Sequence, residues 1–374
     1  MKIAILVAGL PPIYNGGTEI ATVSIAEHAA KAGHDVHVIA LDGTRKGQEA
    51  YKALENGFHV HRIRTLPYSY VYGVAAIPAA LHTISKLQPD LIHAQGIQVG
   101  LAAMLASQIT GIPYLLYSRG EIFMEWMMKE PMSKLILGKA NRVVSQTNAM
   151  KKEMEKYCKG HIEVIPNGVD IEKFGKIEQN KAREQLGLPH KLDKRGLPAK
   201  GSEIIMSVGK FRQEKNMELF LKIAAIDLSN PMRTYVSVGS GKEFANVINM
   251  ANHLKSGVVF VGEVDNSKIP VYMAAADILV NTSHSEGFPV TILEAYASGL
   301  PVVVPNISGL SEIITEAQNG LLYEPNNERS AIKAIDMILT NQKFRGEISG
   351  NNKRKAREYT WENTVNKLYT TSVS

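Results

Sequence analysis

Residues 277–299 read DILVNTSHSEGFPVTILEAYASG and combine a buried strand, a polar turn and a helix. The strand from Asp277 to Asn281 is apolar on both faces, which is typical of a parallel strand covered on both sides. A helix can start at Pro289, where the missing N–H needs no partner, and it ends at Gly299. The start of such a helix offers free N–H donors and the positive end of its dipole to a phosphate.

Two glutamates bracket this unit, with Glu286 in the turn and Glu294 eight residues later in the helix. Taken alone, they fit an ordinary strand–turn–helix crossover with two solvated carboxylates equally well. The wider pattern E-G-F-P-x-x-x-x-E-A-x-A-x-G-x-P resembles the Glu-x7-Glu motif of retaining glycosyltransferases of family 4, which have the GT-B fold. The matching residues are Glu286, Gly287, Phe288, Pro289, Glu294, Ala295, Ala297, Gly299 and Pro301. The resemblance covers nearly the whole chain.

The length of 374 residues suits two domains rather than one core, and 45% apolar with 21% charged residues is typical of a soluble globular protein. The N-terminal segment MKIAILVAGLPP has a short apolar run without a small-residue cleavage site. It therefore predicts a first strand rather than a signal peptide. A single cysteine, Cys158, excludes an internal disulfide and suits a cytoplasmic protein.

The net charge of +6 favours anionic partners such as a nucleotide, an acidic glycan or an anionic membrane surface. Nucleic acid is not expected, since no helix-turn-helix, zinc or RRM signature is present. We expect a cytoplasmic location, with peripheral contact at the inner face of the membrane.

Apolar strands alternate with helical segments along the chain, which predicts α/β architecture with parallel sheets. The turn at 165–170, IPNGVD, interrupts this alternation and resembles the hinge between the domains of the family. We expect two doubly wound, Rossmann-like domains facing a central cleft, where ligands bind at the carboxyl ends of strands. The acceptor-side domain spans 1–168 and is joined by a C-terminal helix at 358–374, and the nucleotide-sugar-binding domain spans 169–357.

Three loops carry residues suited to a nucleotide diphosphate. Gly16 and Gly17 precede a helix, a weak signal alone, but the family's loop there closes on the donor diphosphate. Another of the three loops, at 262–264, holds the nucleotide base through backbone atoms in related enzymes. The corresponding atoms here are those of Gly262 and Val264. The turn at 238–242, VGSGK, is neither a dinucleotide fingerprint nor a P-loop, because its spacing fails.

The remaining loop of the three, at 208–216, reads VGKFRQEKN and carries three cations. In isolation it is more simply a solvated basic loop. It resembles the family element G-R-x-x-x-x-K-G, whose cations clamp the diphosphate. Lys210 replaces the arginine and Asn216 replaces the final glycine, so Lys215 is the safer assignment, and Arg212 can share the role of the first cation.

Arg119 departs from the family pattern, since many relatives carry a histidine after the strand that begins GIPY. Arginine cannot act as a base, but it can bind a phosphate or a hydroxyl. His93 lies at the end of another strand, where a lone histidine is more often structural than functional.

The resemblance implies transfer of a sugar from a nucleotide diphosphate to a glycan or lipid-linked acceptor hydroxyl, with retention at the anomeric carbon. Lys215, Lys210 or Arg212, together with the N–H groups at Phe288 and after Pro289, beginning with Val290, would stabilise the leaving diphosphate. Glu286 would bind the donor sugar and Glu294 the ribose. We expect no cofactor and no metal, since cations neutralise the diphosphate and no Asp-x-Asp pair follows a strand.

Two alternatives stay open at the level of sequence. A sugar-nucleotide epimerase shares this fold but lacks the Glu-x7-Glu arrangement. A binding protein could keep the donor site without transfer activity. A nicotinamide dehydrogenase is excluded by the missing glycine fingerprint.

The segment 122–142, IFMEWMMKEPMSKLILGKANR, mixes apolar and basic residues and is divided by Pro131. An apolar face with a basic rim can lie on an anionic membrane. Packing of the same apolar residues against the N-terminal sheet is the simpler interpretation.

Overall fold

The computed structural model describes residues 1–11, 14, 16–43, 57–64, 72–119, 131–189 and 202–369. Its contacts divide the chain into two compact units, Met1–Gly168 with Trp361–Ser374, and Val169–Thr360. Residues 358–360, which we expected with the first domain, belong to the second. The reason is backbone pairing with the start of the second unit, because the backbone N–H of Val169 donates to the carbonyl of Tyr359 at 2.8 Å and Val169 forms a bridge with Thr360.

The first unit is built on a seven-stranded sheet in the order β3-β2-β1-β4-β5-β6-β7, and every strand pair is parallel. The central strands β1, β4 and β5 are buried on both faces, whereas the edge strand β3 carries polar residues such as His59 and His61. The strand bounds are β1 (Lys2–Val7), β2 (Asp35–Gly43), β3 (His59–Arg64), β4 (Leu91–Gln95), β5 (Tyr114–Tyr117), β6 (Arg142–Ser145) and β7 (Ile162–Val164).

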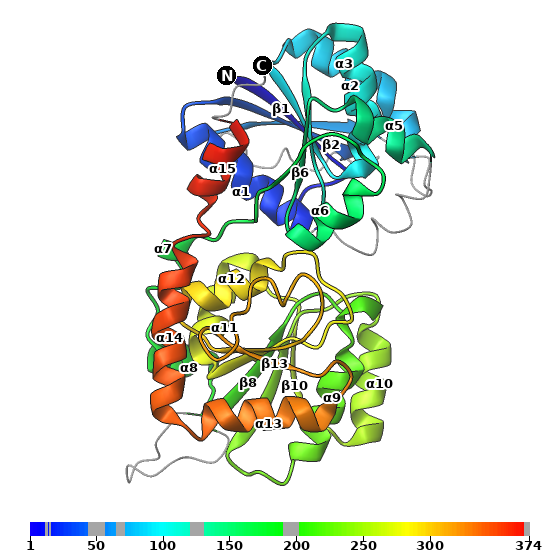
Figure 1. The fold of residues 1–374 in the computed structure, drawn as a ribbon. Coiled ribbons are helices and arrows are strands. Elements are labelled where there is room, and N and C mark those ends of the chain that lie inside the picture. The colour runs from blue at the N-terminus through cyan, green and yellow to red at the C-terminus, as the bar shows by residue number, and fades with distance from the viewer. Residues whose placement is uncertain are drawn as a thin grey trace. The chain divides into compact units, whose positions relative to one another are not determined.

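Helices cover both faces of this sheet (Figure 1). The helices α1 (Gly17–Lys31) and α15 (Trp361–Tyr369) pack side by side on one face. The other face is covered by α2 (Tyr72–Leu87), α3 (Gly100–Thr110), α5 (Pro131–Lys139) and α6 (Asn148–Glu155), with the short η2 (Ile97–Val99) before α3. The C-terminal helix therefore completes the core of the first unit.

The second unit has a six-stranded parallel sheet in the order β10-β9-β8-β11-β12-β13. The strands are β8 (Glu203–Val208), β9 (Arg233–Val238), β10 (Val259–Gly262), β11 (Ile278–Val280), β12 (Val302–Pro305) and β13 (Leu321–Tyr323). The strand order reverses between β8 and β11. In open parallel sheets, such a switch point is where ligands bind, at the carboxyl ends of the strands.

The helices of the second unit also lie on both faces of its sheet (Figure 1). One face carries α11 (Ile269–Ala275) and α12 (Val290–Ala297), and the other carries α9 (Met217–Asp227), α10 (Phe244–Leu254) and α13 (Glu328–Leu339). The remaining helices are α7 (Ile171–Phe174), α8 (Gln179–Leu186), η3 (Gln213–Lys215), η4 (Asn266–Lys268) and α14 (Gln342–Ala356).

Residues 277–299 form the predicted strand, turn and helix, but the strand and the helix are shorter than predicted. Its strand spans Ile278–Val280, and Pro289 is the N-cap of α12 rather than its first residue. Gly299 ends the helix with φ of +70°, and its N–H donates to the carbonyl of Tyr296 at 2.9 Å. Leu300 donates to Ala295 at 2.8 Å, which completes a Schellman motif.

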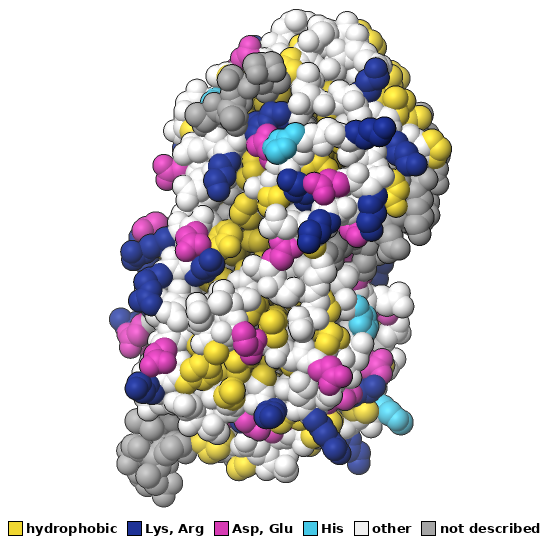
Figure 2. Space-filling view, in the orientation of Figure 1, with side chains coloured by type: hydrophobic (Ala, Val, Ile, Leu, Met, Phe, Trp, Pro, Cys, Tyr) yellow, Lys and Arg dark blue, Asp and Glu magenta, His cyan; other side chains and the backbone are white. Residues whose placement is uncertain are grey.

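The expected membrane segment is only partly described, because residues 120–130 lie outside the described ranges. In the remainder, Ile136 and Leu137 are buried in the first core, as the simpler interpretation required. Met132 and Leu135 are 47% and 44% exposed on the same helix. Lys and Arg side chains are interspersed with Asp and Glu on the face shown in Figure 2. Across the described part of the chain, no helix combines the length and hydrophobicity needed to cross a bilayer.

Asp277 anchors β11 to its neighbours from inside the second unit. Its carboxylate accepts a hydrogen bond from Arg183 at 2.5 Å, and both side chains are almost fully buried. It also accepts from the backbone N–H of Ile204 at 2.8 Å and from Arg345 at 3.3 Å. A buried charge network of this kind is costly to break on one side only.

We expect Asp277→Ala to lower the free energy of unfolding by about 3–5 kcal/mol, because it leaves the Arg183 guanidinium buried without its counter-ion. Urea denaturation gives this value. The matched control is Glu178→Ala, which removes the exposed partner of Lys181 and should cost less than about 1 kcal/mol. Equal effects of the two substitutions would contradict the assignment of Asp277 as an anchor.

Candidate active site

A hollow lies at the switch point of the second sheet, where β8 and β11 end. The ends of these strands line it, together with residues that carry polar side chains: Ser207, Lys210, Lys215, Asn281, Thr282, Ser283 and Thr291. Thr291 belongs to the first turn of α12, in which the amide of Ile292 donates to the Pro289 carbonyl at 3.1 Å and the amides before it have no preceding turn to donate to. Two ammonium groups and a helix start at one hollow make a site suited to an anion.

The central contact of the site is the ion pair between Lys215 and Glu286. The ammonium Nζ donates to Oε1 at 2.7 Å and to Oε2 at 2.8 Å. Asn281 Nδ2 and Ser283 Oγ also donate to Oε1, at 3.0 and 2.6 Å. The Glu286 side chain is 7% exposed, whereas that of Lys215 is 30% exposed. The carboxylate is therefore held from several sides, and the third proton of the ammonium stays available at the hollow.

The backbone holds these two side chains in place. The loop after β8 is bonded to the turn after β11, because His284 N–H donates to Glu214 at 2.8 Å and the Thr282 hydroxyl to the Lys215 carbonyl at 3.1 Å. On the other side, Gly309 has φ of +81° and a side chain there would lie 2.2 Å from the Glu286 carbonyl. The turn that presents Glu286 therefore needs a glycine beside it.

These contacts keep Glu286 ionised. Burial acts to raise its pKa, but the charge of Lys215 and the hydrogen bonds from Lys215, Ser283 and Asn281 outweigh burial and hold the pKa below its ordinary value. At neutral pH the group is an anion with its acceptor atoms fixed. Such a carboxylate can accept sugar hydroxyls and stabilise a developing positive charge.

Glu294 has the opposite environment. It lies in α12 and is 8% exposed, and its carboxylate makes no hydrogen bond or ion pair with any residue that the structure describes. Burial raises its pKa from the ordinary value of 4.5 to about 7, against the weaker opposing charge of Lys173. Neither glutamate is a solvated side chain, so the simpler interpretation of residues 277–299 does not hold.

The other residues expected on the donor side are less closely grouped. Phe288 is buried against the ring of Tyr359, Pro289 caps α12 and Val290 is its first residue. The Arg212 side chain is 54% exposed and lies 3.7 Å from Glu214, and it does not line the hollow. Gly262 ends β10 with φ of +82°. Val264 packs partly against the core of the unit.

Lys210 lines the hollow without an ion pair to any carboxylate among the described residues. It differs in this respect from Lys215, whose charge is shared with Glu286. Both lysines thus line one hollow, and Lys210 is the one whose charge no described carboxylate shares.

The remaining expected residues belong to the first unit. Gly16 caps α1 and Gly17 is its first residue. The Arg119 side chain is 9% exposed and donates to Gln95 at 2.5 Å and to Asn167 at 2.8 Å. Its guanidinium lies over the Tyr117 ring, 4.3 Å from the centroid. Its Nη2 atom has no partner among the described residues. Burial lowers the Arg119 pKa.

His93 contacts the C-terminal helix. It is fully buried, and its Nδ1 atom lies 2.6 Å from the hydroxyl of Tyr369 in the C-terminal helix. Burial and the nearby Arg119 charge lower its pKa well below the ordinary value, so the ring is neutral.

Sequence reasoning missed the residues that support the expected ones. Asn281 and Ser283 fix Glu286, and Gln95 and Asn167 fix Arg119. All four are polar and lie close to a strand end. That position was a usable signal, since polar residues at the carboxyl ends of parallel strands meet at one edge of the sheet.

Comparison with known proteins agrees with this geometry. Residues 190–355 match the family described as Glycosyl transferases group 1, and residues 15–173 match Glycosyltransferase Family 4. These matches show that the protein is a glycosyltransferase, and hence a transferase, and the two Rossmann-like units agree with the GT-B fold. The chain belongs to glycosyltransferase family 4, as the Glu-x7-Glu resemblance predicted.

The chain is 25% identical over 375 residues to a GDP-mannose-dependent alpha-mannosyltransferase of Mycolicibacterium smegmatis, covering 96% of this chain and 94% of that protein. Its fold is similar to that of Anabaena HepE, solved with UDP and glucose, at a TM-score of 0.82 and 20% identity, covering 99% of both chains. It is also similar to WaaG, a glycosyltransferase involved in lipopolysaccharide biosynthesis, at a TM-score of 0.74 and 15% identity, covering 98% of both chains. The two-domain GT-B fold predicted from the sequence is confirmed.

We expect Glu294→Gln to stabilise the unliganded protein at pH 8. A carboxyl whose folded pKa is raised favours the folded state below its unfolded pKa, and this stability is lost as pH rises through about 7. Each pKa unit corresponds to about 1.4 kcal/mol, so the gain is roughly 3 kcal/mol at most. Glutamine resembles the protonated form, so the gain should vanish near pH 4.5.

Urea denaturation of both proteins at pH 4.5 and 8 measures this difference. Glu286→Gln is the matched control and should be destabilising at pH 8, since its native carboxylate has a lowered pKa. A gain from Glu294→Gln that is equal at both pH values would contradict the buried, uncompensated state of Glu294.

Proposed function

We propose that the enzyme transfers a sugar from a UDP- or GDP-sugar to an acceptor hydroxyl, with retention at the anomeric carbon. The observation that carries this is the hollow at the β8–β11 switch point, where Lys210, Lys215 and the start of α12 converge beside an ionised Glu286. The UDP in HepE and the GDP-mannose dependence of the mycobacterial relative support a nucleotide-sugar donor.

In this proposal the diphosphate binds at the hollow. Lys210 contributes a positive charge that no described carboxylate shares. Lys215 donates two hydrogen bonds to Glu286, and its third ammonium N–H is available to the diphosphate. The first amides of α12 add donors that are already oriented. The backbone at Gly262 and Val264 would hold the base.

The charge that develops on the leaving diphosphate is stabilised by these fixed donors, which need no reorganisation during the reaction. Glu286 accepts hydroxyls of the donor sugar and stabilises positive charge at its anomeric carbon. Glu294 accepts the ribose hydroxyls, which supply the partners that this buried carboxylate lacks. The leaving phosphate oxygen takes the proton of the acceptor hydroxyl, so that no side chain has to act as a base. No metal takes part.

Arg119 binds a hydroxyl or phosphate group and does not act as an acid or a base. Its guanidinium is buried among neutral partners, Gln95, Asn167 and the Tyr117 ring, with one nitrogen unpartnered among the described residues. The Glu19 carboxylate acts on this cation without forming an ion pair with it. A buried cation without a carboxylate in contact favours an anionic or strongly polar group nearby.

The proposed acceptor is a cell-surface glycan or glycolipid precursor, made at the cytoplasmic face of the membrane. The role of WaaG in lipopolysaccharide biosynthesis supports this class of acceptor. The exposed Met132 and Leu135, next to the exposed Lys134 and Lys139, are the described residues that would contact an anionic membrane.

We expect Lys210→Ala to lower kcat/KM for the preferred donor about 10- to 100-fold, because a charged hydrogen bond is worth about 1.5–3 kcal/mol. A panel of UDP- and GDP-sugars identifies that donor, and NMR of the product should show the anomeric configuration of the donor. Full activity should persist in EDTA. The control is Lys242→Ala, an exposed lysine after β9. Unchanged kcat/KM in Lys210→Ala would contradict the assigned diphosphate site.

We expect the protein to sediment with vesicles that contain anionic lipid at low salt and to be released at high salt. The double substitution Leu135→Ser with Lys134→Glu should weaken this binding. Ile226→Ser with Lys222→Glu makes the same changes on α9 of the second unit and should not. A folded protein that stays in the supernatant at low salt would exclude the membrane contact and favour a soluble acceptor.

A further inference from the structure

A second group of chemically active side chains lies in the first unit, away from the residues assigned to sugar transfer. Asp35 and His37 stand two apart on β2, and His59 and His61 stand two apart on β3. Residues two apart on a strand point to the same face. His37 is the direct neighbour of His59 in the register of these parallel strands. Strand pairing therefore brings three imidazoles and a carboxylate together on one face.

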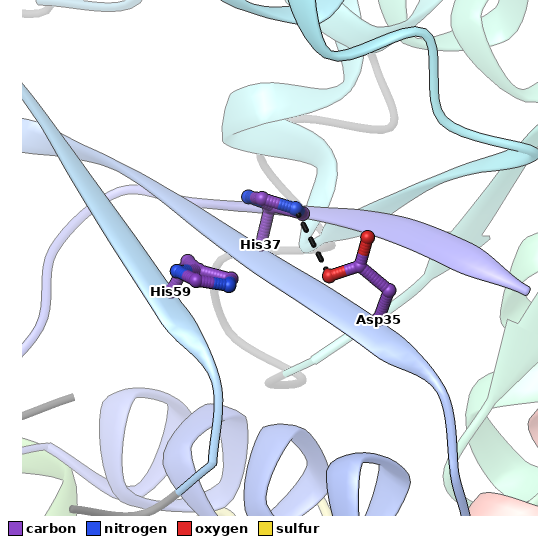
Figure 3. A group of neighbouring side chains, drawn as sticks. All are labelled: Asp35, His37 and His59. Carbon is purple, nitrogen blue, oxygen red and sulfur yellow. Dashed lines mark ion pairs between the residues drawn. The ribbon is translucent and has the colours of Figure 1, made fainter. Parts of the chain in front are cut away.

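The distances are close to those of a metal site. One ligand atom each from Asp35, His37 and His59 lies within 4.8 Å of the others (Figure 3). Nε2 of His37 is 3.2 Å from Oδ1 of Asp35. Two ligands of a tetrahedral zinc ion, at bonds of about 2.0–2.2 Å, lie roughly 3.3–3.5 Å apart. The Asp35–His37 pair already has nearly this spacing.

His59 needs the larger adjustment. Its ring stacks on that of His37, with centroids 4.6 Å apart and an interplanar angle of 16°. Stacked rings cannot both aim a nitrogen at one ion, so His59 has to turn about its side-chain torsions. The His59 side chain is exposed, which leaves it room to turn.

His61 completes the arrangement as a supporting residue. Its Nε2 atom lies 2.9 Å from Nδ1 of His37. When His37 donates through Nδ1 to His61, the lone pair of its Nε2 faces Asp35 and is available to a metal. Metal-binding histidines are usually oriented by such a second hydrogen bond.

An imidazole binds a metal through the lone pair of one ring nitrogen. Lys2 is the competing cation, since its ammonium lies 3.9 Å from Asp35, but both side chains are partly exposed and free to separate.

We propose that Asp35, His37 and His59 bind a divalent transition metal of the kind that imidazole prefers, with Zn²⁺ as the leading candidate and His61 as the positioning residue. The site lies at the amino ends of β2 and β3, whereas Arg119 follows the carboxyl end of β5 in the same parallel sheet. Its role is therefore structural. The ion would fasten the edge strand β3 to β2, and sugar transfer would not require it.

The test uses the full-length chain without an affinity tag. Titration with Co²⁺ should give visible d–d absorption bands of a site with nitrogen and oxygen ligands, and calorimetry with Zn²⁺ should give one ion per chain. Saturating Zn²⁺ should raise Tm by about 3 °C or more, since it binds the folded state. EDTA should reverse this shift without reducing transfer activity.

Single substitutions locate the ion. His59→Asn and His37→Asn should each remove the Co²⁺ bands, and His61→Asn should weaken binding about 10- to 100-fold. His253→Asn, on α10 of the second unit, is the control and should bind like the parent. His59 is exposed, so its substitution tests the site even if His37→Asn fails to fold. No stoichiometric binding by the parent, or binding unchanged in His59→Asn, would overturn the proposal.

Discussion

The ion pair between Lys215 and Glu286 is the interaction on which the candidate active site depends. It joins the loop after β8 to the turn after β11, which are the two strand ends that flank the switch point. Burying such a pair is costly and rarely improves stability over apolar packing, so it is poor evidence of a structural purpose. The ion pair contributes to function through the position of its two charged groups. It fixes a carboxylate with its acceptor atoms oriented and keeps one ammonium proton at the hollow.

The two glutamates of the motif illustrate how one helix and its preceding turn create two chemical environments. Glu286 is surrounded by donors and stays ionised, whereas Glu294 is buried without a partner and has a pKa near neutrality. In the proposed function, the first is prepared in the free enzyme and the second gains its partners when the ribose binds. Part of the binding free energy then offsets the cost of a buried, uncompensated carboxylate.

The fold could be predicted because parallel strands buried on both faces appear in the sequence as short, continuous apolar runs. The elements around Asp277–Gly299 illustrate this, although the strand was predicted two residues too long. The supporting residues could not be predicted, since they depend on contacts between distant segments. Arg183 reaches Asp277 across 94 positions, and His37 meets His59 only through strand register. The boundary at 358–360 differs from the prediction for the same reason, because Val169 pairs with Thr360, which lies far from it along the chain.

The most direct test of the central claim is the rate of sugar transfer by Glu286→Gln, measured below its Tm with the donor saturating. Glutamine keeps the shape of the side chain but removes the charge that holds Lys215 and stabilises the reacting sugar. The account predicts a fall in kcat of about 10²–10³, the scale of removing one preorganised electrostatic group. A folded Glu286→Gln enzyme with the parent's kcat would contradict the account.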